Sequence, residues 1–143
     1  MRSFRLLFAS ILLGVTAGCS SNTTGTSTSN APPPTPTTAD ITIVQGASTM
    51  TTGAFNPDTK TVALNGGASV SVRWVNEDIT SSGGYGGGTT AVTHHIVSDD
   101  GTSFDTGLID GNQTSTKALT AAGTYHYHCA IHPNMVGSVV VNP

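Results

Sequence analysis

Three side chains that bind soft metal ions lie close together near the end of the sequence. Cys129, His132 and Met135 follow one another at intervals of three residues within residues 125–137, which read Tyr-His-Tyr-His-Cys-Ala-Ile-His-Pro-Asn-Met-Val-Gly. They provide a thiol, an imidazole and a thioether. The alternating residues before the cysteine predict a strand, and the proline and glycine after it predict a tight loop. A strand that ends in such a loop can direct all three side chains to one point.

A thiolate and two imidazoles in one plane, with a weak axial thioether, form the ligand set of blue copper centres. The second imidazole has to come from elsewhere in the chain, and His94 and His95 are both candidates. This ligand set leaves no coordination position open for substrate or water, which favours transfer of one electron over catalysis. A zinc site is a weaker alternative, because the thioether of Met135 is a poor zinc ligand.

The first residues are similar to a secretion signal. Two arginines precede an apolar run over residues 6–15, which is too short to span a bilayer as a helix. The Val-Thr-Ala-Gly-Cys sequence that ends at Cys19 resembles a bacterial lipoprotein box. We therefore expect residues 1–18 to be a lipoprotein-type signal peptide and Cys19 to carry the lipid. A cut by an ordinary signal peptidase, giving a soluble secreted protein, is the alternative. In both cases the protein is exported, to the periplasm or the cell surface.

The remainder of the chain divides into a tether and one domain. Residues 19–39 are rich in Ser, Thr and Pro and have almost nothing to bury, so we expect a solvated tether. Residues 40–143 have the size of a single domain. They carry three basic residues against eight acidic ones, a net charge of −5, which argues against nucleic acid as a partner. With Cys19 lipidated, Cys129 is the only thiol left and no disulfide can form within the chain.

Short β-rich runs separated by turn residues fill residues 40–143, and no helical period is present. Strands are predicted at residues 41–44, 61–64, 70–76, 91–98, 104–109, 114–119, 124–129 and 138–141. Residues 55–58 are predicted as a turn and the Gly/Ser-rich residues 80–90 as a loop. Seven or eight short strands at regular spacing predict an all-β fold, an antiparallel-rich Greek-key sandwich. Alternation places Val70, Val72 and Trp74 on its buried face.

These features together resemble the cupredoxins, in particular the plastocyanin and amicyanin branch. The resemblance spans most of residues 41–141 and rests on Phe-Asn-Pro at 55–57, Trp-Val-Asn-Glu-Asp at 74–78, His-His-Ile-Val-Ser-Asp-Asp-Gly at 94–101 and Gly-Thr-Tyr-His-Tyr-His-Cys at 123–129. The Cys-x-x-His-x-x-Met spacing is similar to the short ligand loop of amicyanin, whereas plastocyanin has two more residues before its methionine. The resemblance implies a copper-binding β-sandwich that carries electrons between larger redox partners.

The resemblance and the strand pattern both favour His94 over His95 as the fourth ligand. Similar proteins read Pro-His-Thr-Val-Thr-Ser-Asp-Asp, which aligns with residues 93–100 and places the ligand at His94. If His95 pointed inward instead, alternation would bury the carboxylate of Asp99 beside a thiolate, which is costly without a partner. At His95 relatives often carry Asn or Thr, so its role stays open. We predict a site for one type 1 copper ion made of His94, Cys129, His132 and Met135.

The residues around this predicted site have simpler interpretations. Tyr125 and Tyr127 share a face with Cys129 and are expected to fill the core beneath it. His126 and His128 point outward, either to chelate a second ion or, more simply, to be solvated. Four aspartates in the second half of the domain form either an acidic surface for a basic partner or ordinary turns: Asp99, Asp100, Asp105 and Asp110.

The resemblance also implies how the protein meets its partners. In relatives, the imidazole edge of the last histidine reaches the surface through an apolar patch, and redox proteins dock there. Carried over to this chain, docking is expected near His132, beside Ile131, Pro133 and Val136. We expect a monomer that contacts a membrane only through lipid at Cys19.

Two alternative functions use related chemistry. Copper delivery, storage or resistance in the cell envelope would need much the same ligands, but with a labile site that favours Cu(I). A copper enzyme would need a second copper centre wired through a histidine next to the cysteine. His128 does precede Cys129, but Ala130 follows it and the chain has no second domain of this kind. We therefore expect no enzymatic activity.

Overall fold

A computed structural model describes residues 38–81 and 88–143 of the chain. The expected signal peptide, residues 1–18, and nearly all of the expected tether, residues 19–39, lie outside the described residues. Within the described part of the chain, no helix has the length and hydropathy needed to cross a membrane.

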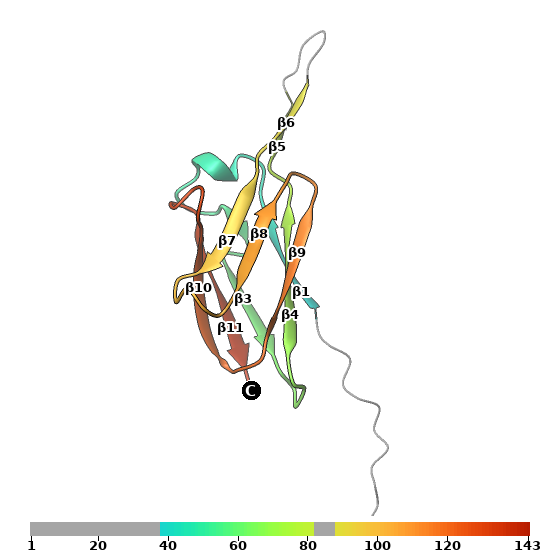
Figure 1. Cartoon of the computed structure of the whole chain (residues 1–143), viewed down its shortest axis with the longest axis vertical. Helices are drawn as coiled ribbons and strands as arrows, with labels where there is room; N and C mark the ends of the chain where they lie inside the picture. The colour runs from blue at the N-terminus through green and yellow to red at the C-terminus, as the bar shows by residue number, and fades with distance from the viewer. Residues whose placement is uncertain (1–37, 82–87) are drawn as a thin grey trace, which may run out of the picture. The chain divides into compact units, whose positions relative to one another are not determined.

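Two β-sheets form the layers of the domain (Figure 1). The first sheet has the strand order β2 (Phe55–Asn56), β1 (Thr38–Ile43), β4 (Val70–Asn76) and β9 (Thr114–Leu119). The second sheet has the order β3 (Thr59–Ala63), β11 (Val136–Asn142), β10 (Gly123–Cys129), β7 (His94–Ser98) and β8 (Asp105–Ile109). Neighbouring strands pair antiparallel except for β1 with β4 and β3 with β11, which are parallel. The predicted all-β sandwich is confirmed.

Three short segments complete the described structure. Strands β5 (Ile79–Ser81) and β6 (Thr89–Ala91) form a separate hairpin, and η1 (Ala47–Thr49) is one turn of 3-10 helix. The eleven strands of the described residues exceed the seven or eight predicted, because β2, β5 and β6 have only two or three residues each. Such short strands have no alternating pattern long enough to recognise in a sequence.

Three local predictions differ from the structure. The strand predicted at residues 91–98 is divided into β6 and β7, because the N–H of Val92 donates to the carbonyl of Asp78 and leaves the sheet ladder. The turn predicted at residues 55–58 contains strand β2, which pairs with β1 and buries Phe55. The two ends of the loop predicted at residues 80–90 form the β5–β6 hairpin, and its middle, residues 82–87, lies outside the described residues.

The core between the sheets is built around an aromatic cluster. Val70, Val72 and Trp74 are buried on one face of β4, as the alternation predicts. The ring of Tyr127 from β10 meets Trp74 edge to face at 5.7 Å between ring centroids. Tyr127 is fully buried, which confirms its predicted core position. Tyr125 is half-buried, and its hydroxyl donates to the carbonyl of Ala121, so it packs at the border of the core.

We expect a Gly137→Ala substitution to destabilise the fold. A Cβ at Gly137 would lie 2.5 Å from Cζ and from the hydroxyl oxygen of Tyr127, whose ring is held in the core. Overpacking of this kind costs about 1–3 kcal/mol. Chemical denaturation measures the difference, with Gly88→Ala as the matched control because its Cβ would meet nothing within 4 Å. Equal stability of Gly137→Ala and wild type would contradict this packing.

The turn after β7 predicts a loss of stability in acid. The Asp100 carboxylate accepts hydrogen bonds from the hydroxyl of Ser103, from the N–H groups of Thr102 and Ser103, and from the hydroxyl of Ser98. These bonds hold the pKa of Asp100 well below its usual value. The contribution is therefore complete above the unfolded pKa, about 3.8, and is lost as the pH falls toward the lowered folded pKa.

An Asp100→Asn variant should thus be less stable than wild type at pH 7, and the difference should shrink steadily below about pH 4. Denaturant midpoints of both proteins across this range measure it. A difference that stays constant with pH would show that the hydrogen bonds do not act through the charge of Asp100.

Candidate metal centre

The loop between β10 and β11 is closed by its own backbone and by β7. The N–H of Cys129 donates to the carbonyl of Met135 at 3.0 Å, and the N–H of Met135 donates to the carbonyl of His132 at 2.9 Å. The N–H of Ala130 donates to the carbonyl of His95 at 2.7 Å, which joins the end of β10 to the start of β7. The tight loop predicted from proline and glycine is therefore present, and it stands beside the strand that carries the upstream histidines.

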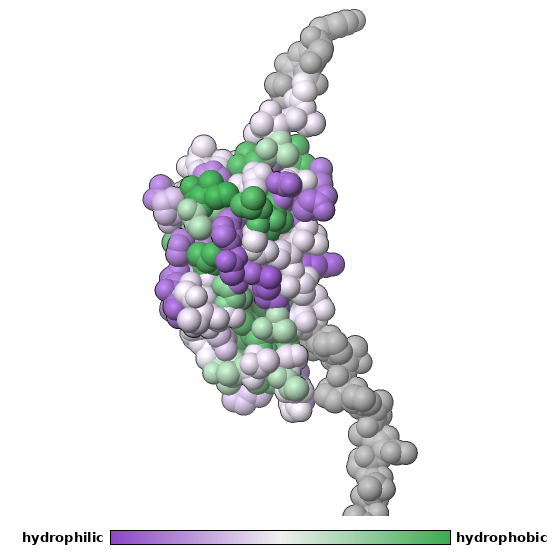
Figure 2. Space-filling model, viewed as in Figure 1, coloured by the Kyte–Doolittle hydropathy of each residue, from purple (hydrophilic) through white to green (hydrophobic). Residues whose placement is uncertain are grey.

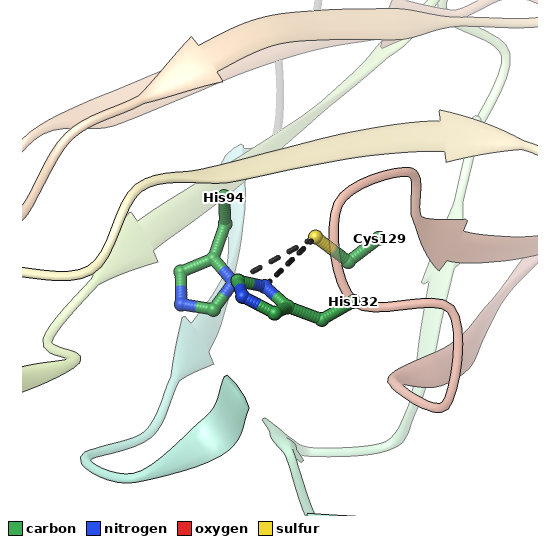
Figure 3. Close-up of side chains that lie close together, drawn as sticks. All are labelled: His94, Cys129 and His132. Carbon is green, nitrogen blue, oxygen red and sulfur yellow. Dashed lines mark hydrogen bonds between the residues drawn. The ribbon is translucent and has the colours of Figure 1, made fainter. Parts of the chain in front are cut away.

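Three donor atoms meet at this point (Figure 3). The Nδ1 atoms of His94 and His132 each lie 3.7 Å from the Sγ of Cys129, and 3.3 Å from one another. His94 comes from the start of β7, and Cys129 and His132 come from the loop after β10. His94 and Cys129 are fully buried, whereas His132 is half-buried, so only its ring reaches toward solvent.

The geometry of these donors fits a metal ion. A point equidistant from the three atoms lies about 2.1 Å from each, close to the usual bond lengths from a metal to imidazole nitrogen and thiolate sulfur. One thiolate and two imidazoles are the in-plane donors of a type 1 copper site. The cluster of His94, Cys129 and His132 is thus compatible with such a site.

Met135 lies on the inner side of the same loop. Its side chain is fully buried in the core cluster that also contains Cys129. Its backbone makes both hydrogen bonds that close the loop on Cys129 and His132. Its place is consistent with the axial role predicted for it, and that role stays a prediction.

The surroundings of Cys129 favour its thiolate form. Burial raises the pKa of this thiol, but the hydrogen bond with His94 and the N–H groups of His95, His132 and Ile131 outweigh burial and lower the pKa to about 6. Burial also opposes a charge on His94, yet its bonds to Cys129 and Asp78 raise the pKa of this imidazole. A thiolate is the form that binds metal.

His94 has a second partner that the sequence analysis did not assign. Its Nε2 lies 3.0 Å from Oδ2 of Asp78, and both side chains are fully buried. The N–H of Asp78 donates to Oδ1 of Asn76, which is also fully buried. The Nδ2 of Asn76 donates to the carbonyl of Val92, two residues before His94, and to the carbonyl of Ile109, which pairs with His94 in the sheet.

A signal for these two residues was present in the sequence. Asn76 and Asp78 continue the alternation of Val70, Val72 and Trp74, so both fall on the buried face. A buried amide and a buried carboxylate need partners, and polar residues that extend a core pattern therefore indicate a site.

The remaining histidines lie outside the cluster. His95 is half-buried, and its Nε2 contacts Oδ1 of Asp105 at 2.6 Å. His128 pairs with Asp99 through Nδ1 at 2.6 Å, and His126 is exposed. Within the described residues, the one group of three or more candidate ligands is the cluster of His94, Cys129 and His132. Among residues 38–81 and 88–143, His126 and His128 thus have no third candidate ligand close enough to make a second site with them.

The aspartates considered as an acidic surface each have a local partner. Besides the histidine pairs of Asp99 and Asp105, the hydroxyl of Thr93 donates to Asp110 at 2.7 Å, and Asp100 organises the turn after β7. Local structure accounts for these residues without a partner protein.

Comparisons with known proteins support the fold. No family model matches the sequence, and no curated protein matches it either. Among solved structures, the purple cupredoxin from Nitrosopumilus maritimus is similar, with 24% identity and a TM-score of 0.57, over 73% of this chain and 99% of that one. The Cu(I) form of a mutant amicyanin is similar with 20% identity and a TM-score of 0.50, over 73% and 82% of the two chains. The chain therefore has a cupredoxin-like fold.

We expect an Asn76→Ala substitution to loosen the fold next to the cluster. It leaves the carbonyls of Val92 and Ile109 and the N–H of Asp78 without the partners they have now. Buried polar groups without partners cost about 1–3 kcal/mol each, and a total loss of about 2–4 kcal/mol is expected after relaxation. Thermal or chemical unfolding measures it, with the exposed Asn142→Ala as control. An unchanged stability would mean that this amide does not hold the two segments together.

Proposed function

We propose that this protein binds one copper ion and transfers electrons. The observation that carries the proposal is the triangle of one sulfur and two imidazole nitrogens, formed by two buried residues and the half-buried His132 and sized for a metal ion. Copper held there by His94, Cys129, His132 and Met135 would supply one-electron transfer between Cu(II) and Cu(I). The cupredoxin-like fold adds support, because one similar structure is named as a purple cupredoxin and the other as the Cu(I) form of an amicyanin mutant.

The residues of the chain suit this function in two ways. Backbone hydrogen bonds from β7 and within the ligand loop hold the donors in a fixed arrangement, so little rearrangement is needed when the charge of the site changes. The four proposed ligands also leave no position directed at a substrate. We therefore propose an electron carrier and no catalytic activity.

The partners are proposed to dock beside His132. Its ring is half-buried, and the neighbouring Ile131, Pro133 and Val136 are exposed. Figure 2 shows hydrophobic groups on the surface at the end of the domain where the loop between β10 and β11 lies. A redox protein that docks on this small apolar surface would lie close to the His132 ring, so the path of the electron between the two proteins would be short. We further propose that the protein is exported, anchored through lipid at Cys19, and monomeric.

Copper binding can be tested by adding Cu(II) to the purified protein. We expect an intense thiolate-to-copper absorption near ~600 nm and narrow copper hyperfine splitting in the electron paramagnetic resonance spectrum. Cys129→Ser should abolish the band, and His94→Ala should abolish or strongly shift it, because each removes one donor of the triangle. His95→Ala is the matched control and should keep the band, since the side chain of His95 contacts Asp105 and only its backbone N–H, which alanine retains, contacts Cys129.

Two outcomes would contradict the proposal. A protein that stays colourless with Cu(II) and binds only Cu(I) would point to copper delivery or storage instead. Loss of the band in His95→Ala, with retention in His94→Ala, would show that the wrong histidine has been assigned.

A further inference from the structure

The carboxylate of Asp78 is the one acidic group of the described residues that is fully buried. An unpaired carboxylate in such a place would be protonated or would destabilise the fold. Asp78 has partners on both oxygens. Oδ1 accepts from the N–H of Gly46 at 2.7 Å, and Oδ2 accepts from the N–H of Ser48 at 3.3 Å and contacts Nε2 of His94 at 3.0 Å. Donors thus surround it, as an ionised acceptor requires.

The beginning of η1 gives these donors, with Gly46 as its N-cap residue and Ser48 in its turn. Gly46 has φ of 79°, in the left-handed region where a glycine is favoured. This conformation lets the N–H groups of residues 46 and 48 face the same carboxylate. The N–H of Asp78 is in turn held by Oδ1 of Asn76 at 2.9 Å. Three separate segments therefore fix the position of one charge.

This charge determines which nitrogen of His94 carries a proton. A carboxylate accepts hydrogen bonds and does not donate them, so Nε2 of His94 has to be the donor. The other nitrogen, Nδ1, is the one that points at Cys129 and His132. A hydrogen bond from the outer nitrogen of a ligand imidazole to a carboxylate sets the orientation of the ring and makes the ligating nitrogen more basic.

We propose that Asp78 is a positioning residue for the metal centre. Asp78 holds His94 with Nδ1 directed at the site, and the negative charge of Asp78 favours Cu(II) over Cu(I) there. The second part rests on the proposed function. The first part concerns the protein alone and applies whichever metal it holds. By contrast, the Asp105 carboxylate is exposed and bonds to His95 outside the cluster, so it should have neither effect.

The positioning part is tested on the full-length protein without metal. In wild type, Nε2 of His94 should carry a proton that exchanges slowly with solvent and gives a downfield nitrogen-attached proton signal in NMR spectra. In Asp78→Ala this signal should be lost or exchange rapidly, whereas in Asp105→Asn it should be unchanged. Finding Nε2 of His94 without a proton in wild type would overturn the proposal, and this needs no variant to fold.

The electronic part is tested on the copper-loaded protein. Asp78→Asn removes the charge and keeps one oxygen that can accept from Nε2, although its NH2 group takes the place of the oxygen that accepts from the N–H of Gly46, while Asp78→Glu restores the charge. We expect the ratio of Cu(II) to Cu(I) affinity to fall about tenfold in Asp78→Asn, which raises the reduction potential by ~59 mV for one electron. Asp78→Glu should lie closer to wild type, and Asp105→Asn should equal it.

The failures of the two proposals are distinguishable. A potential that is the same in Asp78→Asn and wild type would overturn the electronic role of Asp78 while leaving copper binding intact. A wild-type protein that forms no coloured Cu(II) site would overturn the proposed function and with it the electronic role, and the NMR signal of His94 would still support or overturn the positioning role.

Discussion

The charge of Asp78, placed where water does not reach, is the constraint on which the arrangement of the site depends. A buried carboxylate is stable only when donors surround it, and here the donors come from the turn formed by Gly46 and η1 and from His94 on β7. The end of β4, this turn and the start of β7 therefore have to meet at one point. Asn76 strengthens the same junction by bonding to Val92, just before β7, and to Ile109, the partner of His94 on β8. The hydrogen bonds of Asn76 and Asp78 thus connect the two sheets at this end of β4.

The two imidazoles of the cluster have different surroundings, which suggests different tasks. His94 is fully buried, and its Nε2 bonds to Asp78 on the side away from the cluster, so its ring has a defined orientation before any metal binds. His132 belongs to the loop between β10 and β11 and is half-exposed among apolar neighbours. Cys129 links strand β7, which carries His94, to the loop that carries His132. Its sulfur accepts a hydrogen bond from the N–H of His95 at 3.4 Å, and its own N–H donates to the carbonyl of Met135. One imidazole of the cluster is thus anchored in the fold, and the other faces the outside.

The strand pattern was sufficient to predict much of this arrangement. Alternation at Val70, Val72 and Trp74 predicts the buried face of β4, and the same rule places His94 inward and Asp99 outward, as the structure has them. Asp99 is exposed, as expected for a carboxylate that would be costly to bury without donors. This cost did not exclude the burial of Asp78, because the donors of Asp78 come from residues 46 and 48, about thirty positions earlier in the chain.

By itself, the sequence determined the all-β class, the longer strands of the sandwich and the candidate ligands, because periodicity and ligand chemistry are properties of neighbouring residues. Only the tertiary structure decided that Nδ1 of His94 faces the cluster, that His95 and His128 are occupied by Asp105 and Asp99, and that Asp78 stands behind the site. These facts depend on which segments meet across the two sheets. A local pattern carries no information about such contacts, since the partners are set by the packing of the whole domain.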